Sequence, residues 1–262
     1  MKRYITVYFK MVLAHIKGLM QYKVDFFIGV FSTISLQAAN LSLIWVIFQN
    51  VQDLKGYSYH HILFIYGTAT LAKAINHIFF DNLWRLPDDY VKKGGMDRLL
   101  TKPLNPLFYL IAERFQQDGI GNLVIGIAVV NYAVTKLSFT FSLFTFLIYL
   151  VFVLMGGILY GAINLITASF SFRFIRVFPL ISVIHNLNQF TRYPIQIFNK
   201  FFKSLLTWVV PFAFASFYPV EALLNGFDSV YAFLIIPFGI LFTMIAYQIW
   251  LWNLGAYSST GS

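Results

Sequence analysis

The side chains with the most chemical potential inside an apolar block are Lys73, Asn76 and His77. Asn76 and His77 follow Lys73 by three and four residues, so on a helix the three share one side. A lysine, an amide and an imidazole in this arrangement could contribute to a proton or ion relay. Such a relay also needs a carboxylate at mid-membrane depth, and none of the apolar blocks has one. The pattern therefore argues against proton-coupled transport.

The sequence lacks the motifs of the common catalytic sites. It has no G-x-x-x-x-G-K-[ST] loop for nucleotide phosphates, no H-E-x-x-H and no G-x-S-x-G elbow. Its five histidines have no carboxylates at metal-ligand spacing, and it has no cysteine. We therefore predict no catalytic residue, no metal site and no cofactor on this chain.

The region richest in charge is 81–106, which holds nine of the twenty-nine charged residues in about a tenth of the chain. Gly94 and Gly95 predict a turn, and a short helix from Met96 would be stopped by Pro103 and Pro106. A solvated loop needs no aromatic and aliphatic side chains, yet this one has many. We therefore predict a docking surface for a partner protein, formed by Tyr90, Lys92, Lys93, Gly94, Gly95, Met96, Asp97, Arg98, Leu99 and Leu100.

A second cluster of polar residues follows at the start of the next apolar block. It consists of Glu113, Arg114, Gln117 and Asp118. Arg114 and Asp118 have the i, i+4 spacing that pairs charges on a helix. The cluster is interpreted as a self-satisfied cytoplasmic charge patch at a helix end, with contact to a cytoplasmic partner as the alternative.

Composition decides the class of protein. Of the 262 residues, 59% are hydrophobic and 11% charged, whereas soluble domains carry roughly 25% charged residues. This excludes a soluble protein and predicts an all-α integral membrane protein. About 20 apolar residues cross a bilayer, so the length allows about six spans. The net charge is +9, and the lysines and arginines behind it flank the apolar runs, as topology and lipid-surface signals do. The charge therefore does not indicate binding of nucleic acid.

The elements that position these residues follow from the apolar pattern. Residues 1–23 place Arg3, Lys10 and Lys17 seven apart, which predicts an amphipathic interfacial helix; the alternative is a basic leader that orients the first span. The third span should project from the membrane, which it enters near Gly119. The fourth contains Gly157 and Gly161, a spacing that lets helices approach closely. The predicted spans are Asp25–Phe48, His61–Phe80, Leu107–Val134, Phe139–Phe170, Phe174–Phe190 and Phe227–Leu254.

The segment 195–226 is apolar but broken by prolines. Pro194, Pro211 and Pro219 divide it into pieces too short to span, so we predict two short helices that enter the membrane and return. Irregular backbone at that depth must be buried in protein or line a watery cavity.

The lysines and arginines predict the orientation. With six spans and a cytoplasmic N-terminus, twelve of them flank the cytoplasmic side and five the opposite side. Both termini and the region 81–106 are then cytoplasmic.

Four stretches of the chain together resemble a known family. They are the run GGMDRLLTKPLNP at 94–106, the Tyr193-Pro194 break followed by Ile197-Phe198, the triplet Phe217-Tyr218-Pro219, and the ending WNLGAYSSTG at 252–261. In this order they are similar to the ABC-2 type exporter permeases, in particular to bacterial permeases of about this length that pair with an antibiotic-export-like ATPase.

The resemblance implies a single permease domain over 1–262 in a bacterial cell membrane. It implies a coupling helix between spans two and three, here within 90–100, and an outer gate between spans five and six that includes Tyr193, Pro194, Pro211, Tyr218 and Pro219. Two separate ATPase chains would hold ATP and Mg²⁺, and a second permease, identical or sibling, would complete the path. The expected role is export of a lipid, peptide or drug, in contact with membrane lipids, without catalysis on this chain. The alternatives are an ion- or proton-coupled carrier and a non-transporting immunity or scaffold protein.

Overall fold

The computed structural model describes residues 2–174, 176–227 and 229–259. Outside them lie the first residue of the predicted interfacial helix, the last two of the run 252–261, and single positions in the predicted fifth and sixth spans. The described residues form helices and connecting segments, and they contain no β-strand. The helices are α1 (Lys2–Leu19), α2 (Lys23–Asn50), α3 (Tyr59–Phe80), α4 (Gly95–Leu100), α5 (Pro106–Ala112), α6 (Asp118–Lys136), α7 (Leu143–Ser169), α8 (Phe178–Leu187), α9 (Lys200–Ser204), α10 (Phe217–Leu224) and α11 (Val230–Leu254).

Five helical segments among the described residues are long and apolar enough to cross a membrane. They are α1–α2 together, α3 with its extension to Lys92, and α6, α7 and α11. The predicted fifth span is not confirmed, because the region 174–190 contains the ten-residue helix α8 and then a 3₁₀ turn, η5 (Asn188–Arg192). Ten helical residues extend about 15 Å, roughly half the apolar thickness of a bilayer.

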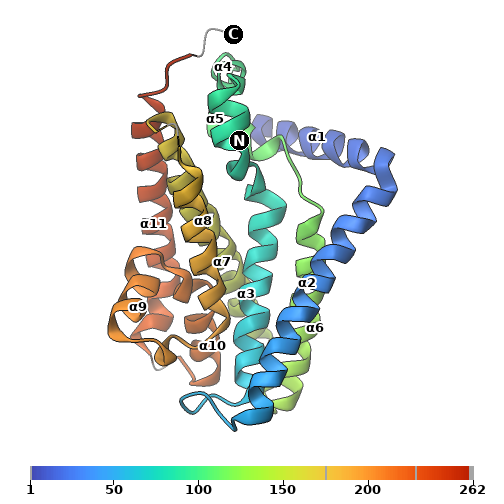
Figure 1. Cartoon of the computed structure of the whole chain (residues 1–262), viewed down its shortest axis with the longest axis vertical. Coiled ribbons are helices and arrows are strands. Elements are labelled where there is room, and N and C mark those ends of the chain that lie inside the picture. The colour runs from blue at the N-terminus through green and yellow to red at the C-terminus, as the bar shows by residue number, and fades with distance from the viewer. Residues whose placement is uncertain (1, 175, 228, 260–262) are drawn as a thin grey trace.

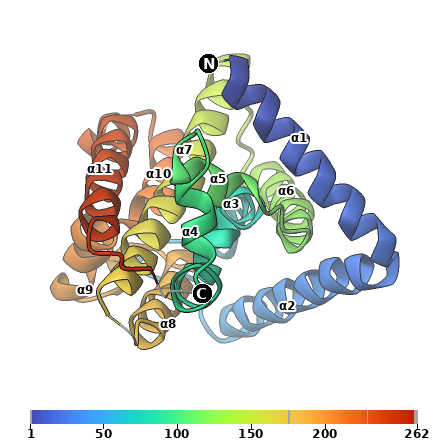
Figure 2. The same ribbon diagram turned by 90° about the horizontal axis from the view of Figure 1, so that it is seen from above.

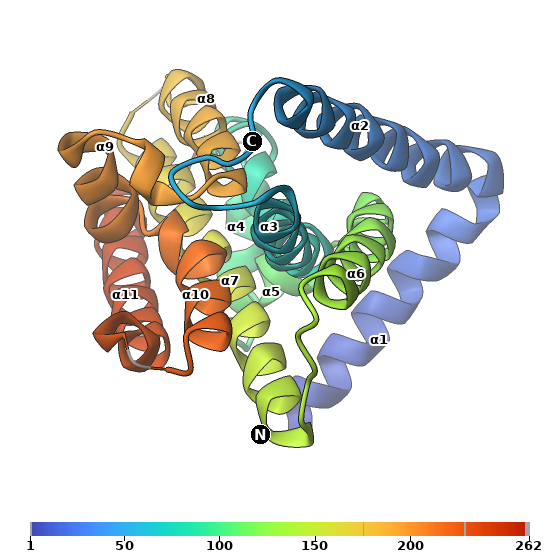
Figure 3. The same cartoon turned by 90° about the horizontal axis from the view of Figure 1, so that it is seen from below.

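Helix α3 lies at the centre of the bundle (Figure 3). It packs closely against α6 and α7, and α11 packs on the far side of α7. A Cβ added at Gly157 would lie 2.5 Å from the Ile75 side chain, and one at Gly161 would lie 2.8 Å from the ring of Phe80. The predicted close approach of helices at these glycines is thus confirmed.

Helix α1 is nearly perpendicular to the long axis of the molecule, and α2 descends from its end (Figure 1). A short 3₁₀ turn, Met20–Tyr22, makes this bend. Both helices leave large apolar side chains exposed, among them Phe9, Phe27 and Phe31. An amphipathic helix across the end of a bundle fits the predicted interfacial position.

The predicted third span is divided into two helices. Helix α5 ends at Ala112, and α6 begins at Asp118 after an irregular link. A single helix projecting from the membrane is therefore not what forms. The break falls at Glu113, which pairs with Arg98 and Lys102 of the α4 region. The predicted start of the membrane portion near Gly119 agrees with α6, which begins at Asp118 and is long and apolar enough to cross a membrane.

The region 195–226 consists of short helical pieces, but there are more of them than the two short helices that we predicted. Besides α9 and α10 it contains η6 (Ile195–Ile197), η7 (Leu205–Val209) and η8 (Phe212–Ala215). Figure 1 shows α9 and α10 toward the end of the molecule opposite α4, α5 and the chain termini. Their membrane depth stays a prediction.

Candidate functional site

The first candidate site is the turn and helix between α3 and α5. Gly94 has φ +73°, a left-handed conformation that favours glycine, and α4 follows directly. A Cβ at Gly95 would lie 2.6 Å from the backbone oxygen of Asp89. The two glycines therefore permit a tight reversal that brings α4 against the preceding helical segment η3 (Leu86–Lys92). Figure 2 shows α4 at the exposed end of the bundle, near α5 and above α3.

The apolar side chains of this region point inward. Leu86, Tyr90, Met96 and Leu99 are buried in one cluster with Trp250 of α11. The apolar content that predicted a docking surface therefore mainly fastens α4 to its own bundle. The exposed residues of the predicted docking set are Leu100, which is 44% exposed, the lysines Lys92 and Lys93, and Arg98, which is paired with Glu113.

Glu113 joins α4 to α5 through three hydrogen bonds. Its carboxylate accepts from Arg98 Nη2 at 2.8 Å, Tyr90 Oη at 2.9 Å and Lys102 Nζ at 3.0 Å. Burial alone would raise the pKa of Glu113, but the hydrogen bonds from Lys102, Tyr90 and Arg98 outweigh it and hold that pKa below its ordinary value. Its side chain is only 13% exposed, so Glu113 is a structural anchor rather than part of an open charged surface.

The other members of the predicted charge patch do not pair along one helix. Arg114 lies 3.9 Å from Asp81 and donates to Gln116, and Gln116 donates to Asp118. The predicted i, i+4 pair of Arg114 and Asp118 is wrong, because the chain is not helical between them. Gln117 has a buried side-chain oxygen with no hydrogen-bond partner in the described part of the chain.

The remaining charges near α4 are exposed. Lys92 pairs with Asp88 at 2.6 Å, and Lys93 pairs with Asp89 at 2.7 Å, each over one helical turn. Asp97 accepts a hydrogen bond of 2.7 Å from the hydroxyl of Ser259. Exposed pairs of this kind add little stability, so these charges can exchange partners readily.

The predicted outer-gate residues lie in or beside the short helical pieces at the other end. Tyr193 and Pro194 form the extended link after η5, and Pro211 separates η7 from η8. Tyr218 stacks on Tyr231 of α11 with ring centroids 4.3 Å apart, and Pro219 follows it in α10. Aromatic stacking thus holds α10 on α11, and the gating role stays a prediction.

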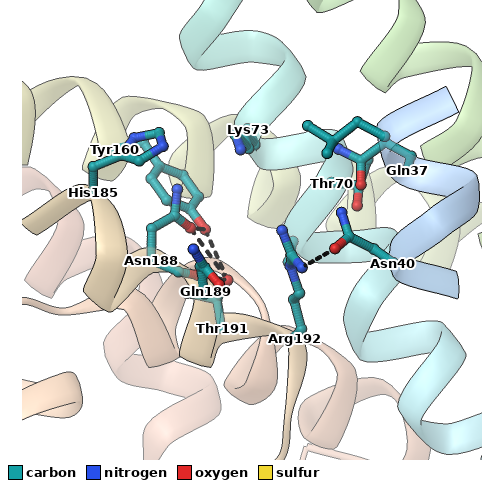
Figure 4. A pocket seen from close by; sticks show the side chains of 12 residues that line it. Gln37, Asn40, Thr70, Lys73, Tyr160, His185, Asn188, Gln189, Thr191 and Arg192 are labelled. Carbon is teal, nitrogen blue, oxygen red and sulfur yellow. Dashed lines mark hydrogen bonds between the residues drawn. The ribbon is translucent and has the colours of Figure 1, made fainter. Parts of the chain in front are cut away.

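The second candidate site is a polar cavity that sequence reasoning missed. It measures about 170 Å³ and lies between the middle of α2, the middle of α3, α7, α8 and η5 (Figure 4). Most of its lining is polar, although it lies within the helical bundle; the lining residues are Leu36, Gln37, Asn40, Ala69, Thr70, Lys73, Tyr160, His185, Asn188, Gln189, Thr191 and Arg192.

Hydrogen bonds fix most of the polar side chains of this cavity. Arg192 Nη1 donates to Asn40 Oδ1 at 2.7 Å, and the Tyr160 hydroxyl donates to Asn188 Oδ1 at 2.9 Å. Gln37 donates to Asn122 at 2.6 Å and accepts from Tyr66. The signal in the sequence was the set of polar residues in apolar blocks, but their spacing could not show that α2, α3 and η5 share one cavity.

A neighbouring cavity of about 290 Å³ continues toward the end that carries α4. It shares Tyr160, His185 and Asn188 with the first and adds His77 and Asp81, so polar side chains follow one another along α3. Across residues 2–174, 176–227 and 229–259, no three His, Asp or Glu side chains converge to hold a metal ion. The arrangement can accommodate a polar group inside the bundle.

Several helices long and apolar enough to cross a membrane, packed around an internal polar cavity, indicate a multi-pass membrane protein. Residues 34–261 match the family described as ABC-2 family transporter protein, and the chain belongs to this family. It is accordingly a membrane permease of an ABC transporter, a kind of subunit that is typically non-catalytic and associates with ABC ATPases. No curated protein and no solved structure shows a significant match.

Proposed function

We propose that this chain is the transmembrane subunit of an ATP-driven exporter that moves an amphipathic or hydrophobic molecule out of the cytoplasm or the inner leaflet. Two separate ATPase chains bind ATP with Mg²⁺, and a second permease, identical or sibling, completes the path. The protein resides in a bacterial cell membrane with both termini cytoplasmic. The two polar cavities form part of the substrate path.

The observation that supports this proposal most directly is the attachment of α4. Met96 and Leu99 are fully buried in the same apolar cluster as Trp250 of α11 and Leu165 of α7, and Glu113 ties α4 to α5. A force on α4 therefore reaches several long helices at once, because packed side chains transmit displacement. A coupling helix needs this attachment on one side and an accessible surface on the other.

The two sides of the predicted docking set have different roles in this proposal. Tyr90, Met96 and Leu99 hold α4 in place, whereas Lys92, Lys93 and Leu100 contact the ATPase. Arg98 belongs to the first group because it is paired with Glu113. Charge reversal at Arg98 would therefore disturb the attachment of α4 as well as any docking.

Six passes remain the proposed topology, with α8 and η5 as an incomplete fifth pass. The chain runs from the α4 end along α8 to the short pieces η6–α10 and then returns along α11 (Figure 1). Prolines 194, 211 and 219 interrupt this region and prevent one long helix. The short pieces form the proposed outer gate.

The experiment is affinity purification of the tagged chain from its native membrane, with the stoichiometry of the chains that accompany it. We expect two ATPase chains for every two permease chains, and no ATPase activity in the permease alone. Leu100→Asp should remove the ATPase, whereas Val51→Asp, at a residue of similar exposure at the opposite end, should retain it. Full ATPase recovery with Leu100→Asp would contradict docking at α4. Transport driven by a proton gradient without ATP would contradict the exporter itself.

A further inference from the structure

The 170 Å³ cavity contains two cationic side chains and no counter-ion. Lys73 makes no ion pair and no hydrogen bond within residues 2–174, 176–227 and 229–259, and Arg192 makes none with a carboxylate. Arg192 bonds instead to the amide of Asn40 and lies 5.8 Å from the centre of the Tyr66 ring. The described lining residues include no Asp or Glu. Figure 4 shows both cations between the polar residues of α2 and those of η5.

An uncompensated charge inside a membrane protein is costly, and residues that keep one usually face a functional partner. Lysine and arginine are hydrogen-bond donors only. Asn40 lies beside them, and its buried Nδ2 makes no hydrogen bond of ordinary geometry in the described part of the chain. The Tyr66 hydroxyl donates to Gln37, and its oxygen can still accept from Asn40. Lys73 and Arg192 therefore keep donor capacity and positive charge for which the described lining supplies no carboxylate.

The nearest described carboxylate along the cavities does not supply this acceptor. Asp81 lines only the neighbouring 290 Å³ cavity and lies 3.9 Å from Arg114. The positive charge of Lys73 and Arg192 thus remains for a group that comes from outside the chain. A phosphate or carboxylate supplies both the negative charge and several acceptor oxygens.

The size and the opening of the cavity limit the ligand further. A cavity of about 150 Å³ holds a molecule the size of benzene, so 170 Å³ accommodates a small headgroup and not a long chain. Leu36 lines the cavity and is 59% exposed on α2, next to further exposed apolar residues such as Phe31 and Leu43. Helices α2 and α8 flank α3 on the same side of the bundle (Figure 3), so an alkyl chain can lie along α2 outside.

We propose that this cavity binds the anionic headgroup of an amphiphile through Lys73, Arg192 and Asn40, with the alkyl chain along α2. The inference rests on the proposed export function and assigns its substrate class. Exposed α2 leucines and phenylalanines take the apolar portion, and the two cations reject molecules with a positive headgroup.

The test is calorimetric titration of the full chain, purified in a neutral detergent without ATPase, with octyl phosphate as the probe. Octyltrimethylammonium and inorganic phosphate are titrated in parallel, and empty micelles give the blank for partitioning. We expect saturable binding of octyl phosphate only. Lys73→Gln and Arg192→Gln should each raise its Kd about tenfold to a hundredfold, the range for loss of a charge-assisted hydrogen bond.

Lys136→Gln is the matched control, because Lys136 is exposed at the end of α6 and does not line the cavity. It should bind octyl phosphate as the parent chain does. Lys73→Gln should also melt no lower than the parent, since it removes a partly buried cation without a counter-ion. This separates lost binding from lost folding. Unchanged Kd in both cavity variants, or equal binding of octyltrimethylammonium, would overturn the proposal.

If inorganic phosphate binds as tightly as octyl phosphate, the site binds a free anion, and the assignment to an amphiphile is overturned. The titration uses no ATPase, so its result does not depend on coupling to ATP. If no ATPase co-purifies with the chain, the proposed export function is contradicted, whereas the proposed anion site is not affected. Loss of the anion site with normal ATPase association would contradict only the substrate class.

Discussion

Replacement of Glu113 by glutamine should loosen α4 selectively. The variant keeps the shape of the side chain and removes the charge that holds Arg98, Tyr90 and Lys102. One acceptor oxygen remains for three donors. The buried apolar contacts of Met96 and Leu99 are unaltered, so the bundle should remain folded while α4 opens more often.

The expected magnitude follows from the exposure of the partners. A hydrogen bond to a charged group contributes about 1.5–3 kcal/mol, against about 1 kcal/mol for a neutral one. Arg98 is 60% exposed and therefore screened, whereas Lys102 is 28% exposed. We expect a loss of about 2 kcal/mol in the free energy of opening, which is about thirtyfold in the opening equilibrium.

Hydrogen–deuterium exchange measures this opening directly. The amides of Asp97, Thr101 and Lys102 donate to backbone oxygens within α4 and its end, so their exchange reports whether α4 is formed. In Glu113→Gln they should exchange about thirtyfold faster than in the parent chain. Amides in the middle of α3 and α7 should be unaffected.

Asp88→Asn is the matched control, because it also removes one carboxylate of this region. Asp88 pairs with Lys92 at the surface and is 42% exposed, and such pairs contribute less than about 1 kcal/mol. Exchange in α4 should therefore change little. Equal exchange rates in Glu113→Gln and Asp88→Asn would refute the conclusion that Glu113 anchors α4.

Three further predictions concern pH and packing. The pKa of Glu113 is lower in the folded protein than its ordinary value. Its contribution to stability is therefore fully present at pH values above the ordinary pKa and is lost as the pH falls through the lowered pKa. Amide exchange in α4, corrected for intrinsic rates, should accelerate on acidification in the parent but not in Glu113→Gln. Gly119→Ala would place a Cβ 3.0 Å from backbone atoms of α3 and should cost about 1–3 kcal/mol in a thermal melt, whereas Gly18→Ala, with open space around it, should cost nothing. Arg173→Lys should lower the melting temperature more than Arg176→Lys, because only Arg173 bonds Asn253 and stacks 3.6 Å from the Trp252 ring.

The sequence alone was sufficient for the class of protein and for most of the long helices, but not for the predicted fifth span, where only the ten-residue α8 forms. Apolar runs near the length of a bilayer have to be helical, since lipid offers no hydrogen-bond partner to the backbone. The turn before α4 was also readable, because Gly94 takes a left-handed conformation that other residues adopt only with strain. The matching order of short motifs identified the ABC-2 family.

Only the tertiary structure decided which polar residues meet. Glu113 is adjacent to Arg114 in the chain, yet its partners are Tyr90, Arg98 and Lys102. Because the chain is not helical at 113–117, the predicted pair of Arg114 and Asp118 does not form. Lys73 and Arg192 share a cavity although 118 positions separate them in the sequence. Periodicity defines the faces of one helix, but which faces of different helices come together depends on packing, and the anion site exists only through that packing.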